Sequence, residues 1–171
     1  MNTFKRSAPL YIAAMGLAAL PAAAAVGVRF VEGAPKDRFE ITNRAACALR
    51  DTEVVIDLRP SAAGLVFDVT ALGAGVEVFQ PLEIVAGADA LASVSSVVDG
   101  DRQVVLSIRR LAPAARIAFT IDVDDTLGPR GITVSGSEIE GAVVRVNTAG
   151  ATASGRFSNN GEAVVPTPGC R

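Results

Sequence analysis

Three carboxylates fall within four residues of one another in the stretch 120–126, which reads Thr-Ile-Asp-Val-Asp-Asp-Thr. Its alternation of apolar and polar residues predicts a strand with Asp122 and Asp124 on the outer face, about 7 Å apart along the strand. Asp125 follows in the predicted turn, where the chain can bend its carboxylate back toward the other two. Hard oxygen donors that converge at the end of a strand are suited to calcium, with backbone carbonyls and water completing the coordination.

The alternative interpretation is structural: Asp122 and Asp124 face solvent, and Asp125 begins an Asx-turn ahead of the next glycine. The stretch is not an EF-hand, because the loop glycine and the terminal glutamate are missing at the required offsets. A second acidic turn, Asp99-Gly100-Asp101, is predicted to be a hairpin tip rather than a ligand site.

The chain contains no histidine, which excludes histidine triads, histidine-containing zinc sites and imidazole general bases. A serine–lysine dyad would have to use Lys36, and no Ser-x-x-Lys motif accompanies it. Paired carboxylates can hydrolyse glycosidic bonds, yet no pattern marks two of these acids as catalytic. We therefore expect a protein that is not an enzyme and has no cofactor other than calcium. The alternative is a small carboxylate-based hydrolase or a periplasmic substrate-delivery protein.

The N-terminus is typical of a secretory signal peptide. Lys5 and Arg6 precede an apolar run over residues 8–20, Pro21 ends the run, and alanines occupy positions 22–25. We expect a signal peptide over residues 1–25, cleavage after Ala25, and a periplasmic or extracellular protein. The apolar run is too short to span a bilayer stably, so no membrane insertion of the mature chain is expected.

Cleavage after residue 25 leaves 146 residues with 14 basic and 18 acidic side chains, a net charge of −4. A mildly acidic domain is a poor match for nucleic acid, which requires clustered lysine and arginine. The chain has no tryptophan, and its one tyrosine, Tyr11, lies in the signal segment. Without an aromatic platform for sugar rings, the expected partner is a protein or another cell-surface component.

The two cysteines, Cys47 and Cys170, both lie in the mature part of the chain. In an oxidising compartment an isolated pair is expected to form a disulfide, and their wide separation argues against a redox or metal-binding pair. This bridge would fasten the proline-rich C-terminal tail, which has no apolar side chain to hold it in place.

The mature chain is expected to form one all-β domain over residues 26–171. Apolar and polar residues alternate near residues 39–42, 53–59, 65–70, 104–108 and 117–123, with turn residues between these runs. This pattern predicts about eight or more strands in an antiparallel, immunoglobulin-like β-sandwich. Residues 86–95 are expected to form one or two helical turns. Residues 148–162 are expected to form a loop or a poorly specified edge strand.

Five stretches carry a resemblance to a known family: Phe30-Val31-Glu32-Gly33-Ala34-Pro35-Lys36-Asp37-Arg38-Phe39, Gly64-Leu65-Val66-Phe67-Asp68, residues 75–81, residues 119–125 and residues 136–142. Through them, residues 28–146 resemble bacterial secreted proteins known as aggregation factor core proteins. The turn at residues 111–113, ahead of a Phe-Thr-Ile strand, is similar to turns of immunoglobulin-like modules in bacterial surface proteins. The resemblance implies calcium-dependent adhesion. The chain lacks the Gly-rich, Asp-containing nonapeptide repeats of many secreted calcium-binding proteins.

Overall fold

The computed structural model describes residues 25–70, 72, 79–127 and 133–170. These residues form eleven strands and one short 3-10 turn. In chain order the elements are β1 Ala25–Val31, β2 Asp37–Asn43, β3 Leu49–Asp57, β4 Val66–Asp68, β5 Glu83–Ala86, η1 Ala88–Ala90, β6 Leu91–Val94, β7 Gln103–Leu111, β8 Arg116–Asp124, β9 Val143–Thr148, β10 Ala151–Arg156 and β11 Glu162–Pro166.

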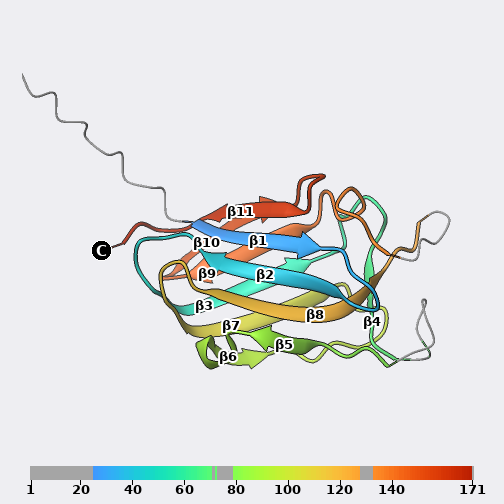
Figure 1. Cartoon of the computed structure of the whole chain (residues 1–171). Coiled ribbons are helices and arrows are strands. Elements are labelled where there is room, and N and C mark those ends of the chain that lie inside the picture. The colour runs from blue at the N-terminus through green and yellow to red at the C-terminus, as the bar shows by residue number, and fades with distance from the viewer. Residues whose placement is uncertain (1–24, 71, 73–78, 128–132, 171) are drawn as a thin grey trace, which may run out of the picture.

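The strands form two antiparallel sheets that pack face to face (Figure 1). The first sheet has the order β11-β1-β2-β8-β4, and β5 also pairs with β8. The second sheet has the order β10-β9-β3-β7-β6. Along β2 and β8, residues alternate between buried and partly exposed, as expected where one face of a sheet is covered. The predicted all-β sandwich is confirmed.

The core between the sheets is aliphatic around a central group of phenylalanines. Phe39 on β2 stacks on Phe119 of β8, with ring centroids 5.1 Å apart. Phe30, Phe67 and Phe157 contact the same ring at tilted or edge-on angles. Four of these five side chains are at most 2% exposed, and Phe30 is 4% exposed. Rings packed in this way stabilise a core beyond the area that they bury.

Of the one or two helical turns predicted over residues 86–95, one short turn is present. The helical part is one 3-10 turn, Ala88–Ala90, between the short strands β5 and β6. Gly87 precedes it with a φ of 72°, a left-handed conformation that favours glycine. The flanking residues instead pair with β8 and β7. Tertiary pairing therefore overrides the helical tendency of this alanine-rich segment.

Residues 148–162 are better ordered than the sequence indicated. β10 forms the edge of the second sheet, which confirms the edge-strand alternative. Its Gly155 is required by close packing, because a Cβ at this position would lie 2.4 Å from the backbone oxygen of Val164 on β11. A side chain here would push β10 away from the strand at the edge of the other sheet.

The predicted disulfide between Cys47 and Cys170 is present, with a Cα–Cα distance of 5.7 Å. It joins the segment between β2 and β3 to the tail beyond β11. Asn43, which is fully buried, holds the first of these segments by donating to the backbone oxygens of Cys47 and Leu111, at 2.8 and 3.0 Å. The bridge thus fastens the tail to a well-packed part of the fold.

Apart from Ala25, which begins β1, the expected signal segment lies outside the described residues. Within the described part of the chain, no helix has the length and apolar character needed to cross a membrane.

Candidate metal centre

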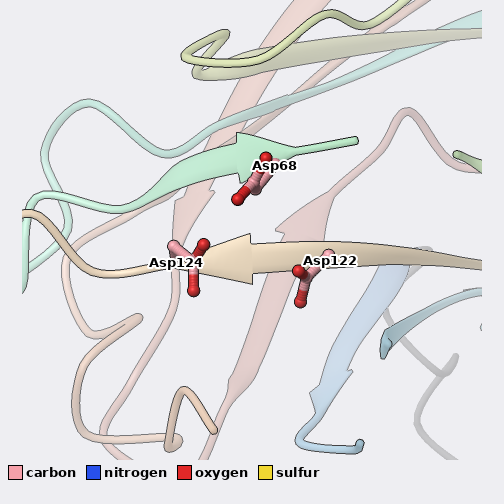
Figure 2. Close-up of side chains that lie close together, drawn as sticks. All are labelled: Asp68, Asp122 and Asp124. Carbon is pink, nitrogen blue, oxygen red and sulfur yellow. The ribbon is translucent and has the colours of Figure 1, made fainter. Parts of the chain in front are cut away.

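Three aspartates lie together on the outer face of the first sheet, on two neighbouring strands (Figure 2). β4 and β8 are antiparallel, and their register sets Asp68 directly opposite Asp122. Because successive residues of a strand point to opposite faces, Ile121 and Val123 lie in the core while Asp122 and Asp124 point outward. The pairing of β4 with β8 adds the third carboxylate.

One carboxylate oxygen from each of these residues lies within 4.8 Å of the others. Asp68 is only 2% exposed, whereas Asp122 and Asp124 are partly exposed. Asp124 shares a hydrogen bond with the Asp68 side chain. The Oδ2 atom of Asp124 is buried and has no hydrogen-bond partner among the described residues. The cluster is therefore closed on the side of Asp68 and open to solvent at Asp122 and Asp124.

Asp37, the first residue of β2, is 2% exposed, and the charges of Asp122 and Asp124 act on it. Its carboxylate accepts hydrogen bonds from two backbone N–H groups. That of Gly33 donates to Oδ1 at 3.1 Å, and that of Val123 donates to Oδ2 at 3.2 Å. Gly33 is needed for this turn, because a Cβ there would lie 2.5 Å from the backbone oxygen of Lys36. The turn thus holds Asp37 at the start of β2, opposite Ile121, and Asp37 is not among the residues whose ligand atoms lie within 4.8 Å of one another.

The surroundings of these carboxyl groups favour their neutral forms. Burial, followed by the charge of Asp68, raises the pKa of Asp122 to about 6. Burial, the hydrogen bond with Asp68 and the neighbouring aspartate charges raise the pKa of Asp124 to about 7. Burial is also the main cause that raises the pKa of Asp37 to about 8, although its two backbone hydrogen bonds oppose the change. A cation placed among these groups would instead favour their ionised forms and lower their pKa values.

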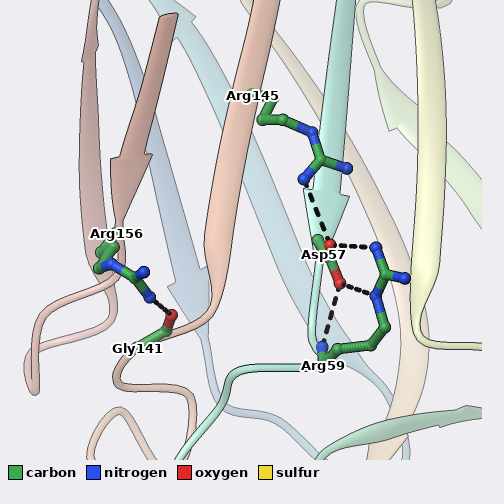
Figure 3. Close-up of polar contacts among 5 residues, drawn as sticks. All are labelled: Asp57, Arg59, Gly141, Arg145 and Arg156. Carbon is green, nitrogen blue, oxygen red and sulfur yellow. Dashed lines mark hydrogen bonds and ion pairs between the residues drawn. The ribbon is translucent and has the colours of Figure 1, made fainter.

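Asp57 provides a comparison within the same molecule, because it is a buried carboxylate whose charge is balanced (Figure 3). Arg59 donates from Nε to Oδ1 at 2.8 Å and from Nη2 to Oδ2 at 2.6 Å. Nη1 of Arg145 donates to the same Oδ2 at 3.4 Å. The hydrogen bond from the Arg59 side chain is the main reason that the pKa of Asp57 lies below its ordinary value. Two arginines therefore balance the charge of this buried carboxylate.

In the described part of the chain, Asp37, Asp122 and Asp124 have no arginine of this kind. Among the described residues, no lysine or arginine forms an ion pair with Asp37, Asp122 or Asp124. Arg116, at the start of β8, instead pairs with Glu40, with Nη1 and Oε1 3.7 Å apart. The other arginine near this segment in sequence, Arg130, lies outside the described residues. Ionisation of Asp122 and Asp124 would therefore add negative charge here that no described lysine or arginine neutralises.

The structure brings together two of the three aspartates that the sequence indicated. Asp122 and Asp124 lie in the cluster, while Asp125 is 6% exposed and is not among the residues whose ligand atoms lie within 4.8 Å of one another. The charge of Asp125 still contributes to the raised pKa of Asp124. Asp68 was not predicted. Its position in an alternating run was visible, but the pairing of β4 with β8 was not.

The second acidic turn lies beside the cluster. Asp99 Oδ1 accepts the backbone N–H groups of Val69 and Thr70, at 2.7 and 2.9 Å, and the Thr70 hydroxyl donates to Oδ2. The bond from Thr70 is the main cause that lowers the pKa of Asp99, and a hydrogen bond with the Asp68 side chain acts in the same direction. Asp99 therefore orders the chain directly after β4, which agrees with a structural role.

Comparisons with known proteins give little similarity. No family model matches the chain, and no curated protein matches it. Among solved structures, a family GH18 chitinase from Chromobacterium violaceum aligns with 80% of this chain and 19% of its own, with 16% identity and a TM-score of 0.36. The chain thus spans about a fifth of that protein's length. A similarity at this level supports no inference about activity, and the cluster must be interpreted from its own geometry.

Proposed function

We propose that this protein is an exported, non-catalytic β-sandwich that binds a divalent cation, calcium, and through it attaches to a protein or another cell-surface component. One observation carries the proposal: Asp68, Asp122 and Asp124 bring carboxylate oxygens within 4.8 Å of one another. Two of these groups have raised pKa values, and no arginine or lysine of the described chain pairs with Asp122 or Asp124.

The donor set favours calcium over other cations. All the candidate ligands are carboxylates, which suit hard cations, and there is no histidine in the chain to favour zinc. Calcium accepts six to eight oxygens in irregular geometry, whereas magnesium requires near-ideal octahedral coordination. Asp68, Asp122 and Asp124 lie on paired strands. A cation would also give the buried Oδ2 of Asp124 the partner that it lacks among the described residues. Backbone carbonyls and water would complete the coordination.

The open side of the cluster supports a binding role. Asp122 and Asp124 are partly exposed, so a bound ion would keep positions that face solvent. A carboxylate or hydroxyl of a partner can occupy those positions, which would make attachment depend on the ion. The disulfide agrees with an oxidising compartment, where calcium is available at millimolar levels.

Cell binding tests this function. The fluorescently labelled protein would be incubated with intact cells of the producing organism, in millimolar calcium or in excess chelator. We expect retention on cells in calcium, release by chelator, and little retention of Asp124→Asn under either condition. The matched control is Asp89→Asn, which changes the same charge at an exposed position in η1. Retention that is indifferent to calcium, or equal for both variants, would contradict the proposal.

A further inference from the structure

The second sheet carries a basic pocket at the end of the sandwich, next to the disulfide. The pocket has a volume of about 660 Å³. It is lined by the loop before β3, the ends of β3 and β7, the turn after β9 and the C-terminal tail. Cys47 and Cys170 both line it, so the disulfide holds the tail in place as one wall.

Two arginines lie opposite each other at this pocket. The antiparallel register of β3 and β7 sets Arg50 directly opposite Arg110, and both side chains are exposed. Like charges directly opposite each other destabilise a sheet. Neither arginine forms an ion pair among the described residues, and no Asp or Glu is among the described residues lining the pocket. This contrasts with Arg59 and Arg145, which share the carboxylate of Asp57.

We infer that the pocket between Arg50 and Arg110 binds an oxyanion, the chemistry shared by carboxylates and phosphates. A guanidinium presents a planar fork of N–H donors that matches either group, and an anion between two such forks would remove their repulsion. Pro113, Pro168 and Ala149 form the less polar part of the lining. They would restrict water around the anion and strengthen its interaction with both arginines. This inference is independent of the proposed cation site, which lies on the other sheet.

Calorimetric titrations of the purified, disulfide-bonded protein would test the pocket, one with succinate and one with inorganic phosphate. We expect saturable binding of at least one of them, and the pair of titrations distinguishes a carboxylate ligand from a phosphate ligand. Arg50→Gln and Arg110→Gln should each weaken that binding about tenfold or more, because each removes a charge-assisted pair of hydrogen bonds. The unliganded melting temperatures of both variants should equal or exceed that of the unaltered protein, because repulsion is relieved.

Arg102→Gln is the matched control, because it removes the same charge from an exposed arginine just before β7, at the far end of that strand from Arg110. It should leave the dissociation constant unchanged within about twofold, as expected for a distant surface charge. The inference is overturned if neither anion binds saturably. It is also overturned if the Arg110→Gln variant binds as well as the unaltered protein, or if Arg102→Gln weakens binding to the same extent.

Discussion

Replacing Asp122 with asparagine should stabilise the protein without calcium and remove its response to calcium. Asp122 lies opposite Asp68, and its carboxylate oxygen is within 4.8 Å of ligand atoms of both Asp68 and Asp124. At that separation two unit charges repel by about 1 kcal/mol in water and about 3 kcal/mol at an effective dielectric constant near 20. Because Asp122 is partly exposed, we expect a net gain of about 1–3 kcal/mol when its charge is removed.

The measurement is thermal unfolding at about pH 9, where groups with these raised pKa values are mostly ionised. A gain of about 1–3 kcal/mol corresponds to a melting temperature about 2–10 °C higher in chelator. Calcium at a hundredfold excess over its dissociation constant should stabilise the unaltered protein by about 2.7 kcal/mol. The Asp122→Asn variant has lost a ligand, so calcium should stabilise it much less.

Asp89→Asn serves as the control, because it removes one charge from an exposed residue away from the cluster. It should change neither the melting temperature in chelator nor the stabilisation by calcium. The reasoning is refuted if Asp122→Asn lowers the melting temperature in chelator. It is equally refuted if the variant and the unaltered protein respond to calcium by the same amount, since Asp122 would then be an ordinary surface residue.

Three other predictions concern pH, the disulfide and the core. Folding raises the pKa of Asp122, Asp124 and Asp37 from 3.8 to about 6, 7 and 8, so the stability that their neutral forms contribute should be fully present below about pH 4 and lost as the pH rises to about 8. Denaturant unfolding in chelator should show this loss, and calcium should reduce it. Reducing the Cys47–Cys170 bridge, which spans 123 residues, should cost about 5 kcal/mol in the chain-entropy model, measured by chemical denaturation with and without reductant. Phe39→Ala should cost about 3–5 kcal/mol by the same method, whereas truncation of exposed Phe79 should cost little.

Local patterns were sufficient to predict the class of fold. Alternation around Phe39, Val54, Leu106 and Phe119 identified β2, β3, β7 and β8, since each of these strands has one covered face. The short strands β5 and β6 were missed because an alanine-rich segment has no strong period, and their conformation comes from pairing with β8 and β7. The cysteine pair was found from compartment and count alone.

The candidate cation site was only partly visible in the sequence. Asp122 and Asp124 share a strand, so their spacing alone placed them on one face. Asp68 reaches the same place through the pairing of β4 with β8, and pairing between distant strands has no local signature. Their proximity in space is set by the register, which only the assembled sheet defines.

A calcium titration followed by calorimetry tests the central claim most directly. The purified protein is expected to bind one ion per chain, with a dissociation constant of about 0.1–1 mM, the range of extracellular calcium modules. Asp68→Asn and Asp124→Asn should abolish this binding while circular dichroism still reports a folded β-protein, and Asp89→Asn should bind as the unaltered protein does. Absence of saturable calcium binding, or undiminished binding by Asp68→Asn, would contradict a cation site formed by β4 and β8.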